Sequence, residues 1–88
     1  MNVHDCIDVK DIQHFTDHQK ANLLTLIKFH GFKPTPGLEL MLSPAMYMID
    51  HGFFVFDPDN EAQWSMKPSA NKISIEELMQ MMELVNFD

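Results

Sequence analysis

The sequence predicts a small α+β domain, and two observations lead to this prediction. Two capping boxes, Thr16 with Gln19 and Ser74 with Glu77, open stretches whose apolar residues recur at helical spacing. Between these stretches, a short aromatic run is followed by turn residues and a second strand-like run. A chain of 88 residues has room for one core, so we expect a single compact domain over residues 1–88.

The first helix is predicted over residues 17–30. A capping box stands at its start, and Asp17 places a negative charge in the first turn, where the helix dipole favours it. Its inward residues lie on one broad face: Leu23, Leu24, Leu26 and Ile27. Gly31 suits the left-handed position that commonly ends a helix, and Phe32 can then pack back onto Ile27.

The segment before this helix permits two interpretations. Ile7 and Val9 alternate with polar residues, as in an edge strand. Its aspartates recur every third residue and would equally suit one face of a helical turn: Asp5, Asp8 and Asp11. Both interpretations stay open for residues 3–12.

Residues 38–52 are the main structural uncertainty. They follow a break at residues 33–37, which contain two prolines and a glycine. Ser43 and Pro44 suit an N-cap and a first helical residue, which favours a short helix at 44–51. The alternative is a strand at 46–49 that pairs with the aromatic run through a three-residue loop. His51 and Gly52 suit the end of such a helix. We favour the helix because signals for both its start and its end are present.

An antiparallel β-hairpin is predicted at residues 53–56 and 61–66. Its turn is Asp57-Pro58-Asp59-Asn60, with proline at the position that its fixed φ suits. Both faces of the first strand are apolar, whereas a strand exposed on one side would alternate with polar residues. Either residues 38–52 cover the second face of the hairpin, or its aromatic side chains partly line a surface.

The C-terminal helix is predicted over residues 75–86. Ser74 and Glu77 form its capping box, and Ile73 can pack against Leu78. Its inward stripe consists of five residues: Ile75, Leu78, Met79, Met82 and Val85. Further apolar residues fall outside this stripe, so the helix carries more apolar surface than one contact face needs: Met81, Leu84 and Phe87.

The charge of the chain argues against direct nucleic-acid binding. Thirteen acidic residues and six lysines give a net charge of −7, and no arginine is present to form bidentate contacts with phosphate or guanine. Residues 1–19 hold four acids and one lysine, residues 20–72 hold five of each, and residues 73–88 hold four acids alone. Acidic ends on a neutral body would attract basic proteins.

Cysteine usage and the absence of targeting signals predict a cytoplasmic protein. The single cysteine excludes an internal disulfide and suits a reducing compartment. Aspartates occupy the N-terminus, where a signal peptide needs a basic start. No apolar stretch approaches the ~20 residues of a membrane helix, so we expect no membrane association.

Metal binding and catalysis have little support in the sequence. Cys6, His14 and His18 are weak candidate zinc ligands, but their spacing matches no established zinc pattern. The alternating acids of the hairpin turn depart from a calcium loop, because Ala62 and Pro68 replace its glycine and its bidentate glutamate. Catalytic and phosphate-binding motifs are absent. We therefore predict no catalytic residue, no cofactor and no metal, in a protein that is not an enzyme.

The apolar and aromatic excess favours a partner-binding surface. Aromatic and methionine side chains ringed by acids are common anchors at protein interfaces. The candidate partner-binding residues are Phe54, Phe56, Trp64, Met81, Leu84, Phe87, Glu76, Glu77 and Glu83. The alternative is that the aromatic residues simply fill the core, and we weigh the two equally.

Part of the chain resembles the small acidic accessory proteins of bacteriophages. The residues that carry the resemblance are Phe53-Phe54-Val55-Phe56-Asp57-Pro58, Trp64 and Ile73-Ser74-Ile75-Glu76-Glu77-Leu78, and it extends over residues 53–82. The resemblance implies a protein that inhibits a host or defence protein by binding it, as anti-CRISPR and anti-restriction proteins do. This class shares no site motif, so the resemblance assigns no residue a role.

The sequence thus predicts a non-enzymatic protein-binding module whose aromatic and methionine surface, flanked by acidic ends, occludes its partner, and the resemblance implies a phage-encoded inhibitor. A basic nucleic-acid-binding protein is one candidate partner. One alternative is a homodimer or accessory subunit, and another is a partial nucleic-acid mimic that blocks a basic groove. A degenerate winged-helix regulator is a further alternative, if residues 38–42 and 44–51 are both helical.

Overall fold

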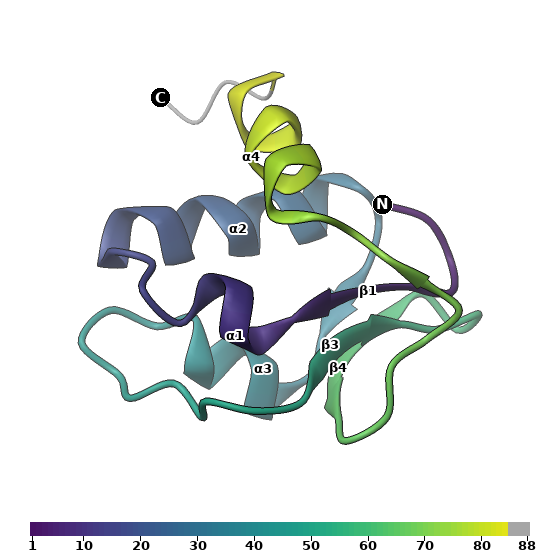
Figure 1. The fold of residues 1–88 in the computed structure, drawn as a ribbon, viewed down its shortest axis with the longest axis horizontal. Coiled ribbons are helices and arrows are strands. Elements are labelled where there is room, and N and C mark those ends of the chain that lie inside the picture. The colour runs from purple at the N-terminus through teal and green to yellow at the C-terminus, as the bar shows by residue number, and fades with distance from the viewer. Residues whose placement is uncertain (85–88) are drawn as a thin grey trace.

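The computed structural model describes residues 1–84, and Figure 1 shows its elements. Helices and strands share one small domain, which confirms the α+β class. The elements in chain order are β1 Asp5–Asp8, α1 Val9–Ile12, α2 Asp17–Phe29, β2 Lys33–Pro34, α3 Pro36–Met41, β3 Phe53–Phe56, β4 Glu61–Ser65, β5 Asn71–Lys72 and α4 Ile75–Leu84. The Cα radius of gyration is 11.6 Å, close to the ~12 Å expected of a compact chain of this length.

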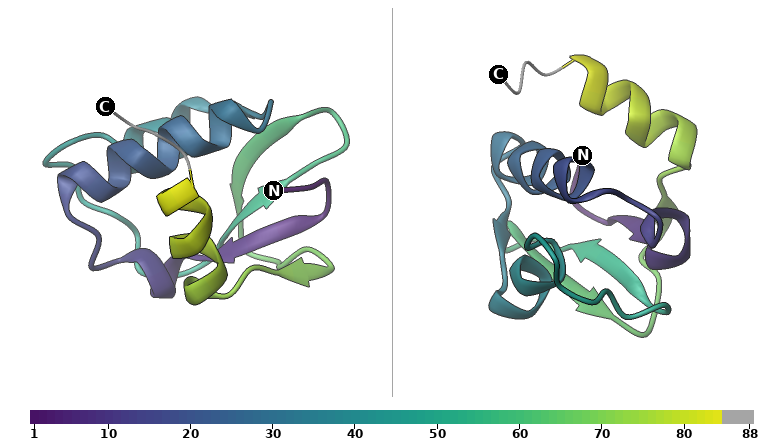
Figure 2. Two further views of the ribbon diagram at one scale, coloured as in Figure 1. Left: turned by 90° about the horizontal axis from the view of Figure 1, so that it is seen from above. Right: turned by 90° about the vertical axis from the view of Figure 1, so that its left-hand side faces the viewer.

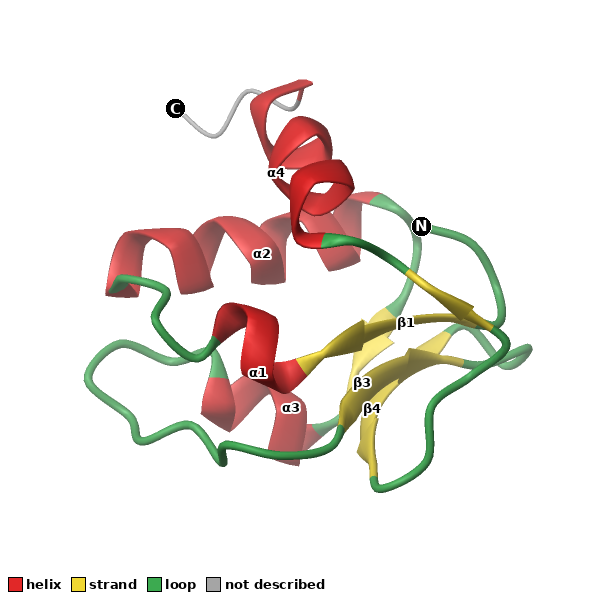
Figure 3. Cartoon of the chain, in the orientation of Figure 1, coloured by secondary structure: helices red, strands yellow, loops and turns green. Residues whose placement is uncertain are grey.

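The strands form one mixed sheet in the order β2-β4-β3-β1-β5 (Figure 3). The central strand β3 pairs antiparallel with β4 and with β1, while β2 and β5 add at the two edges in parallel. Each edge strand has two residues. Helices α2 and α4 lie on the same side of the sheet and pack against each other (Figure 2).

The core lies between the sheet and the helices. Phe54 and Phe56 are fully buried there, and Ile7 of β1 stands directly opposite Phe54. The second face of the hairpin is also covered at Val55 and at its neighbour Cys6, whose thiol lies 3.8 Å from the carbonyl oxygen of Ser69. The segment before β5 therefore covers part of this face.

The helix predicted over 17–30 is confirmed as α2. The Thr16 side chain accepts the Gln19 N–H at 3.1 Å, and the Gln19 side chain accepts the Thr16 N–H at 2.9 Å, which completes the capping box. At the other end Gly31 has a φ of +87°, and the Phe32 N–H donates to the Ile27 carbonyl at 3.2 Å. The helix ends in a Schellman motif, as its glycine predicts.

Residues 3–12 contain both of the structures that the sequence allowed. The alternating residues form β1, which is an inner strand between β3 and β5 rather than an edge. The chain then turns directly into α1, where the Asp8 side chain accepts the Lys10 N–H at 3.0 Å as an N-cap. This short segment therefore forms a strand with alternating side chains and then a single helical turn.

Both interpretations of residues 38–52 are wrong. The helix begins earlier, at Pro36, because proline suits the first helical position after Thr35. It ends at Met41, and residues 44–51 form neither a helix nor a strand. Ala45 has a φ of +63°, a left-handed conformation that a helix starting at Pro44 could not include. The winged-helix alternative required helices at both 38–42 and 44–51, and the second of these is absent.

The predicted hairpin and C-terminal helix are both present. Strands β3 and β4 pair as expected, and β4 ends at Ser65, one residue short of its predicted end. Helix α4 starts at Ile75, and the Ser74 hydroxyl accepts the Glu77 N–H at 3.1 Å. The predicted end of this helix, at residue 86, lies outside the described residues. None of the helices in residues 1–84 has the length and apolar character of a membrane span.

Candidate functional site

The loop of residues 42–52 forms the centre of the candidate site. Two contacts hold it against α2: the buried Lys20 ammonium donates to the Met46 carbonyl at 2.8 Å, and the Ala45 N–H donates to Asp17 Oδ1 at 3.0 Å. A third contact holds it against β4, where the Trp64 indole N–H donates to the His51 carbonyl at 2.9 Å. The loop is therefore fixed at both of its ends.

An apolar groove of about 550 Å³ lies between α3, this loop and β4, and we name it the α3–β4 groove. Its apolar lining consists of Leu38, Leu40 and Met41 from α3, Met46, Tyr47 and Ile49 from the loop, and Trp64 from β4. Leu40 is 54% exposed and Tyr47 is 82% exposed. Large apolar side chains gathered at one exposed groove are typical of a binding surface.

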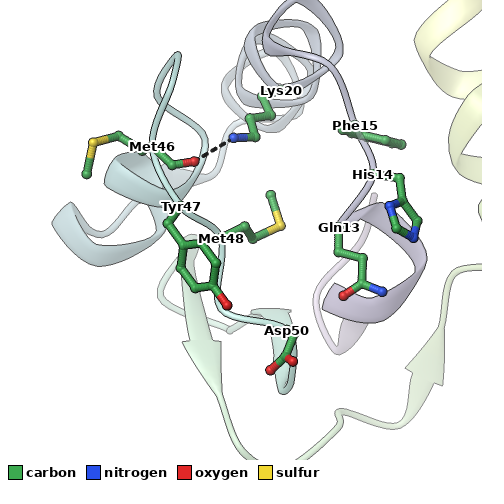
Figure 4. Close-up of a pocket in the computed structure, with 8 residues that line it drawn as sticks. All are labelled: Gln13, His14, Phe15, Lys20, Met46, Tyr47, Met48 and Asp50. Carbon is green, nitrogen blue, oxygen red and sulfur yellow. Dashed lines mark hydrogen bonds between the residues drawn. The ribbon is translucent and has the colours of Figure 1, made fainter.

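A second pocket, of about 390 Å³, lies on the other side of the loop, and we name it the Lys20 pocket (Figure 4). Met46 and Tyr47 line both cavities, so the loop separates them. Among the eight residues in Figure 4 one hydrogen bond is formed, from Lys20 to Met46. Asp50 lies 3.2 Å from His51, which is not among these residues. The pocket therefore holds polar groups without an assembled acid–base pair.

Lys20 itself is a structural cation in this arrangement. It is 7% exposed, and within residues 1–84 no carboxylate oxygen lies within 4.0 Å of its ammonium group. A buried ammonium needs hydrogen-bond acceptors to offset its lost hydration, and the Met46 carbonyl is one. Lys20 thus joins the first turn of α2 to the loop that lines both cavities.

Three carboxylates converge at the hairpin turn. The side-chain oxygens of Asp57, Asp59 and Glu61 lie within 4.8 Å of one another. The turn itself explains this placement, because Asp57 Oδ1 accepts the N–H groups of Asp59 and Glu61, each at 3.0 Å. Gln63 donates to the other oxygen of Asp57 at 2.8 Å. The cluster is thus a partly exposed anionic end of β4.

The weak zinc candidates do not come together. Cys6 is fully buried in β1, whereas His14 and His18 are exposed around the start of α2. In the part of the chain that the structure describes, the hairpin carboxylates are the only group of three or more His, Cys, Asp or Glu side chains close enough together to hold a metal ion.

The predicted partner-binding residues are distributed over three places. For Phe54 and Phe56 the sequence left a surface and a core position equally open, and both are fully buried, because the helices cover the hairpin face on which they lie. Trp64 lines the α3–β4 groove. On α4, Met81 is partly buried against the core, Leu84 is 86% exposed, and the three glutamates are exposed: Glu76, Glu77 and Glu83. Phe87 lies outside the described residues.

The groove residues of α3 and the loop were missed by the sequence analysis. Leu40, Met46, Tyr47 and Ile49 belong to the segment whose conformation the sequence left open. One signal was available, since Pro36 could have been taken as a first helical residue with Thr35 before it. That assignment would have placed Leu38 and Met41 on one helix face and Leu40 on another.

Two of the four N-terminal aspartates support the fold rather than a charged surface. Asp5 is buried, and it accepts hydrogen bonds from the Asn2 N–H at 2.7 Å and the Asn71 side chain at 2.8 Å. Asp8 lies 3.2 Å from the Lys72 ammonium, and this hydrogen bond and charge raise the pKa of Lys72. Fewer free carboxylates are left at this end, which weakens the case for a nucleic-acid mimic.

His30 has a shifted pKa at the end of α2. Partial burial and the positive charge of the N-terminal ammonium lower its pKa below 6.5, although a hydrogen bond with Met1 opposes this. The Met1 nitrogen lies 3.0 Å from His30 Nδ1 and 3.8 Å from the sulfur of Met81. Residue 1 is therefore close to both α2 and α4.

In comparisons with protein-family models, with curated proteins and with solved structures, nothing matches this chain.

Proposed function

We propose that this protein is a non-enzymatic module that binds another protein through the α3–β4 groove. The observation that carries the proposal is the exposure of Leu40, Met46 and Tyr47 around an apolar groove. Burying such side chains in an interface removes apolar surface from water, which is the main favourable term in most protein association. Tyr47 also combines a large apolar body with a polar end, as interface anchors commonly do.

The charge of the protein favours a basic partner. The net charge is −7, and a field of this sign accelerates the encounter with a positively charged surface. The anionic end of β4 adds a local concentration of negative charge on a strand that also lines the groove. We infer that apolar contact supplies most of the affinity and charge supplies orientation.

The expected consequence of binding is inhibition. The phage accessory proteins that this sequence resembles act by occluding a host or defence protein. Occlusion needs a contact surface and no chemistry, which agrees with a site built from leucine, methionine, isoleucine and aromatic side chains.

Affinity capture with matched variants tests this function. The intact protein and a Leu40→Ser/Tyr47→Ser variant are used as baits in the native cell, and captured proteins are quantified by mass spectrometry. A Phe29→Ser variant is the control, because Phe29 is exposed and apolar but lies outside the groove. We expect a partner that the wild type and the control capture and the groove variant loses. A partner held equally by all three would refute the role of the groove.

A homodimer is the second candidate, and a separate observation favours it. Phe29 on α2 and Leu84 on α4 are 69% and 86% exposed, and neither lines the groove. Sedimentation across a concentration series separates the two functions. We expect a monomer, whereas a dimer that Leu84→Ser dissociates and Tyr47→Ser leaves intact would favour self-association.

A further inference from the structure

The outer edge of β4 is paired along only part of its length. Strand β2 pairs with Glu61 and Ala62 and ends at Pro34, after which the chain turns into α3. The last hydrogen bond of this ladder runs from the Thr35 N–H to the Ala62 carbonyl, at 2.9 Å. Within residues 1–84, positions 63–65 therefore pair with β3 on their inner side and have no strand on their outer side.

The hydrogen-bond pattern shows which groups point out from this edge. The Phe56 carbonyl of β3 accepts a hydrogen bond from the His4 N–H, which lies on the β1 side. The Gly52 carbonyl, just before β3, accepts one from the Val9 N–H on the same side. Along an antiparallel strand, successive residues direct their backbone hydrogen bonds to opposite sides, so Phe54 also bonds toward β1. Trp64 lies opposite Phe54 on β4, and these two residues therefore form no backbone hydrogen bonds with each other. The Trp64 N–H and C=O therefore point outward, and no backbone group of the described chain bonds to them.

This unpaired edge adjoins the α3–β4 groove. The Trp64 side chain lines the groove together with Leu38 and Ile49. Residues directly opposite each other on paired strands project their side chains to the same face. A residue that paired beside Trp64 would therefore direct its side chain toward the groove, where an apolar side chain would be buried.

The neighbouring position on the edge faces the carboxylates. Gln63 projects to the opposite face from Trp64, and its amide already reaches Asp57. A lysine or arginine that paired beside Gln63 would share this face and could reach the same cluster. Lys33 stands beside Glu61 in the register, but one lysine against three carboxylates leaves this end of β4 negative.

We propose that the partner contributes an extended segment that adds as a strand along residues 63–65 of β4. This segment carries a large apolar residue beside Trp64 and a lysine or arginine at the adjacent position. The inference rests on the proposed function, because it specifies how the partner enters the same groove. Strand addition of this kind takes affinity from backbone hydrogen bonds and specificity from alternate side chains.

Selection from a displayed library of random decapeptides, with the intact protein as bait, tests the inference. Peptides are retained if they bind the wild type and the Phe29→Ser control but not the Leu40→Ser/Tyr47→Ser variant. Each retained peptide is then synthesised with a methyl group on one backbone nitrogen at a time. We expect sequences in which an apolar residue has a basic neighbour, and methylation that abolishes binding at alternate positions only. The amide N–H of Trp64 should exchange with solvent more slowly in the complex.

The other outcomes separate the two proposals. Some peptides could need the groove but tolerate methylation at every position, and others could repeat apolar residues every three or four positions, as a helix does. Neither kind would bind as a strand. That result overturns strand addition and leaves the proposed function standing. If no peptide distinguishes the wild type from the groove variant, strand addition is wrong, and a capture experiment in which all three baits hold the partner equally overturns the proposed function as well.

Discussion

At the residue scale, Gly52 joins the 42–52 loop to β3 with a φ of +91°, and the Trp64 indole packs directly against it. A Cβ atom at this position would lie 2.6 Å from Cε2 and 2.8 Å from Cζ2 of Trp64, and closer still to Nε1. The indole could move only by breaking its hydrogen bond to the His51 carbonyl. The position thus excludes a side chain for two independent reasons.

Gly52→Ala should therefore destabilise the protein by about 2–4 kcal/mol. About 1–2 kcal/mol comes from the left-handed backbone and the rest from displacing Trp64. Denaturant unfolding measures the change in the free energy of unfolding. Two matched variants complete the series. Gly31 also has a positive φ, but no atom lies near the position of an added Cβ. Gly31→Ala should therefore lower the free energy of unfolding only by the cost of the left-handed backbone, about 1–2 kcal/mol. Gly37→Ala should be neutral or stabilise by up to about 1 kcal/mol. Equal effects at Gly52 and Gly31 would contradict the packing argument.

His30 provides a residue-scale prediction for pH. Because its pKa is lower in the folded protein than in the unfolded chain, the unfolded state binds the proton more readily. Stability should be fully present above pH ~6.5 and should fall as the pH decreases toward the folded pKa. His30→Gln should remove this part of the pH dependence. Denaturant unfolding of both proteins between pH 5 and 7.5 tests it, and a slope unchanged by the substitution would contradict it.

At the element scale, the 42–52 loop shows where sequence patterns were insufficient. Ser43 and Pro44 have the local chemistry of a helix start, yet the chain there follows contacts with Lys20 and Asp17, which are distant in sequence. Met48 is buried and anchors the middle of the loop in the core. Helix propensities differ by only a few tenths of a kcal/mol per residue, so such tertiary contacts outweigh them.

The Lys20 contact yields the element-scale prediction. Lys20→Met should remove the hydrogen bond that fixes the Met46 carbonyl and loosen the loop, at a cost of about 1–2 kcal/mol. Hydrogen exchange should accelerate at the Ala45 amide, whose bond to Asp17 holds the same segment. Lys28→Met is the control, since Lys28 is exposed and its pair with Glu39 spans 3.9 Å, so it should change stability by less than about 0.5 kcal/mol. Unchanged exchange at Ala45 in the Lys20 variant would show that the loop does not depend on this contact.

The capping boxes, by contrast, were sufficient to locate two helices. Both hydrogen bonds of the box form at Thr16, and at Ser74 the hydroxyl accepts the Glu77 N–H. These bonds join residues three positions apart, so sequence spacing alone determines their geometry. The hairpin turn is equally local, with Asp57 accepting from Asp59 and Glu61. Both helices start at the predicted residue, and α2 and the two hairpin strands end within one residue of their predicted ends.

At the scale of the whole molecule, the sheet joins segments from distant parts of the chain. Strand β1 pairs with β3 and with β5, so its register depends on residues about 50 and 65 positions later. The core continues from this sheet to Leu23 of α2 and Leu78 of α4. Strands β1, β3 and β4 all contribute residues to this core: Ile7, Phe54, Phe56 and Ala62.

The protein should therefore unfold as one cooperative unit. Trp64 fluorescence reports strand β4, and far-ultraviolet circular dichroism reports mainly the helices. We expect the two denaturant transitions to coincide, as they do for most small single domains. An earlier transition in circular dichroism would mean that a helix such as α4 separates first, which would contradict a single unit.

The candidate surface also depends on the whole molecule. Of the candidate partner-binding residues, Trp64 lines the groove and the three glutamates of α4 are exposed, whereas the sequence could not assign Phe54 and Phe56 to the core. An aromatic strand has the same pattern whether a second layer covers it or not. Only the placement of α2, α3 and α4 decides which of its faces is buried.

The amino-acid sequence by itself determined the α+β class, both long helices, the hairpin and the net charge, because each depends on residues that are close together or on composition alone. The tertiary structure decided the position of β1, the course of the 42–52 loop and the α3–β4 groove. These features arise from contacts between residues far apart in sequence, such as Lys20 with Met46 and Trp64 with His51. Their energies exceed local preference, and no pattern within a short window records them.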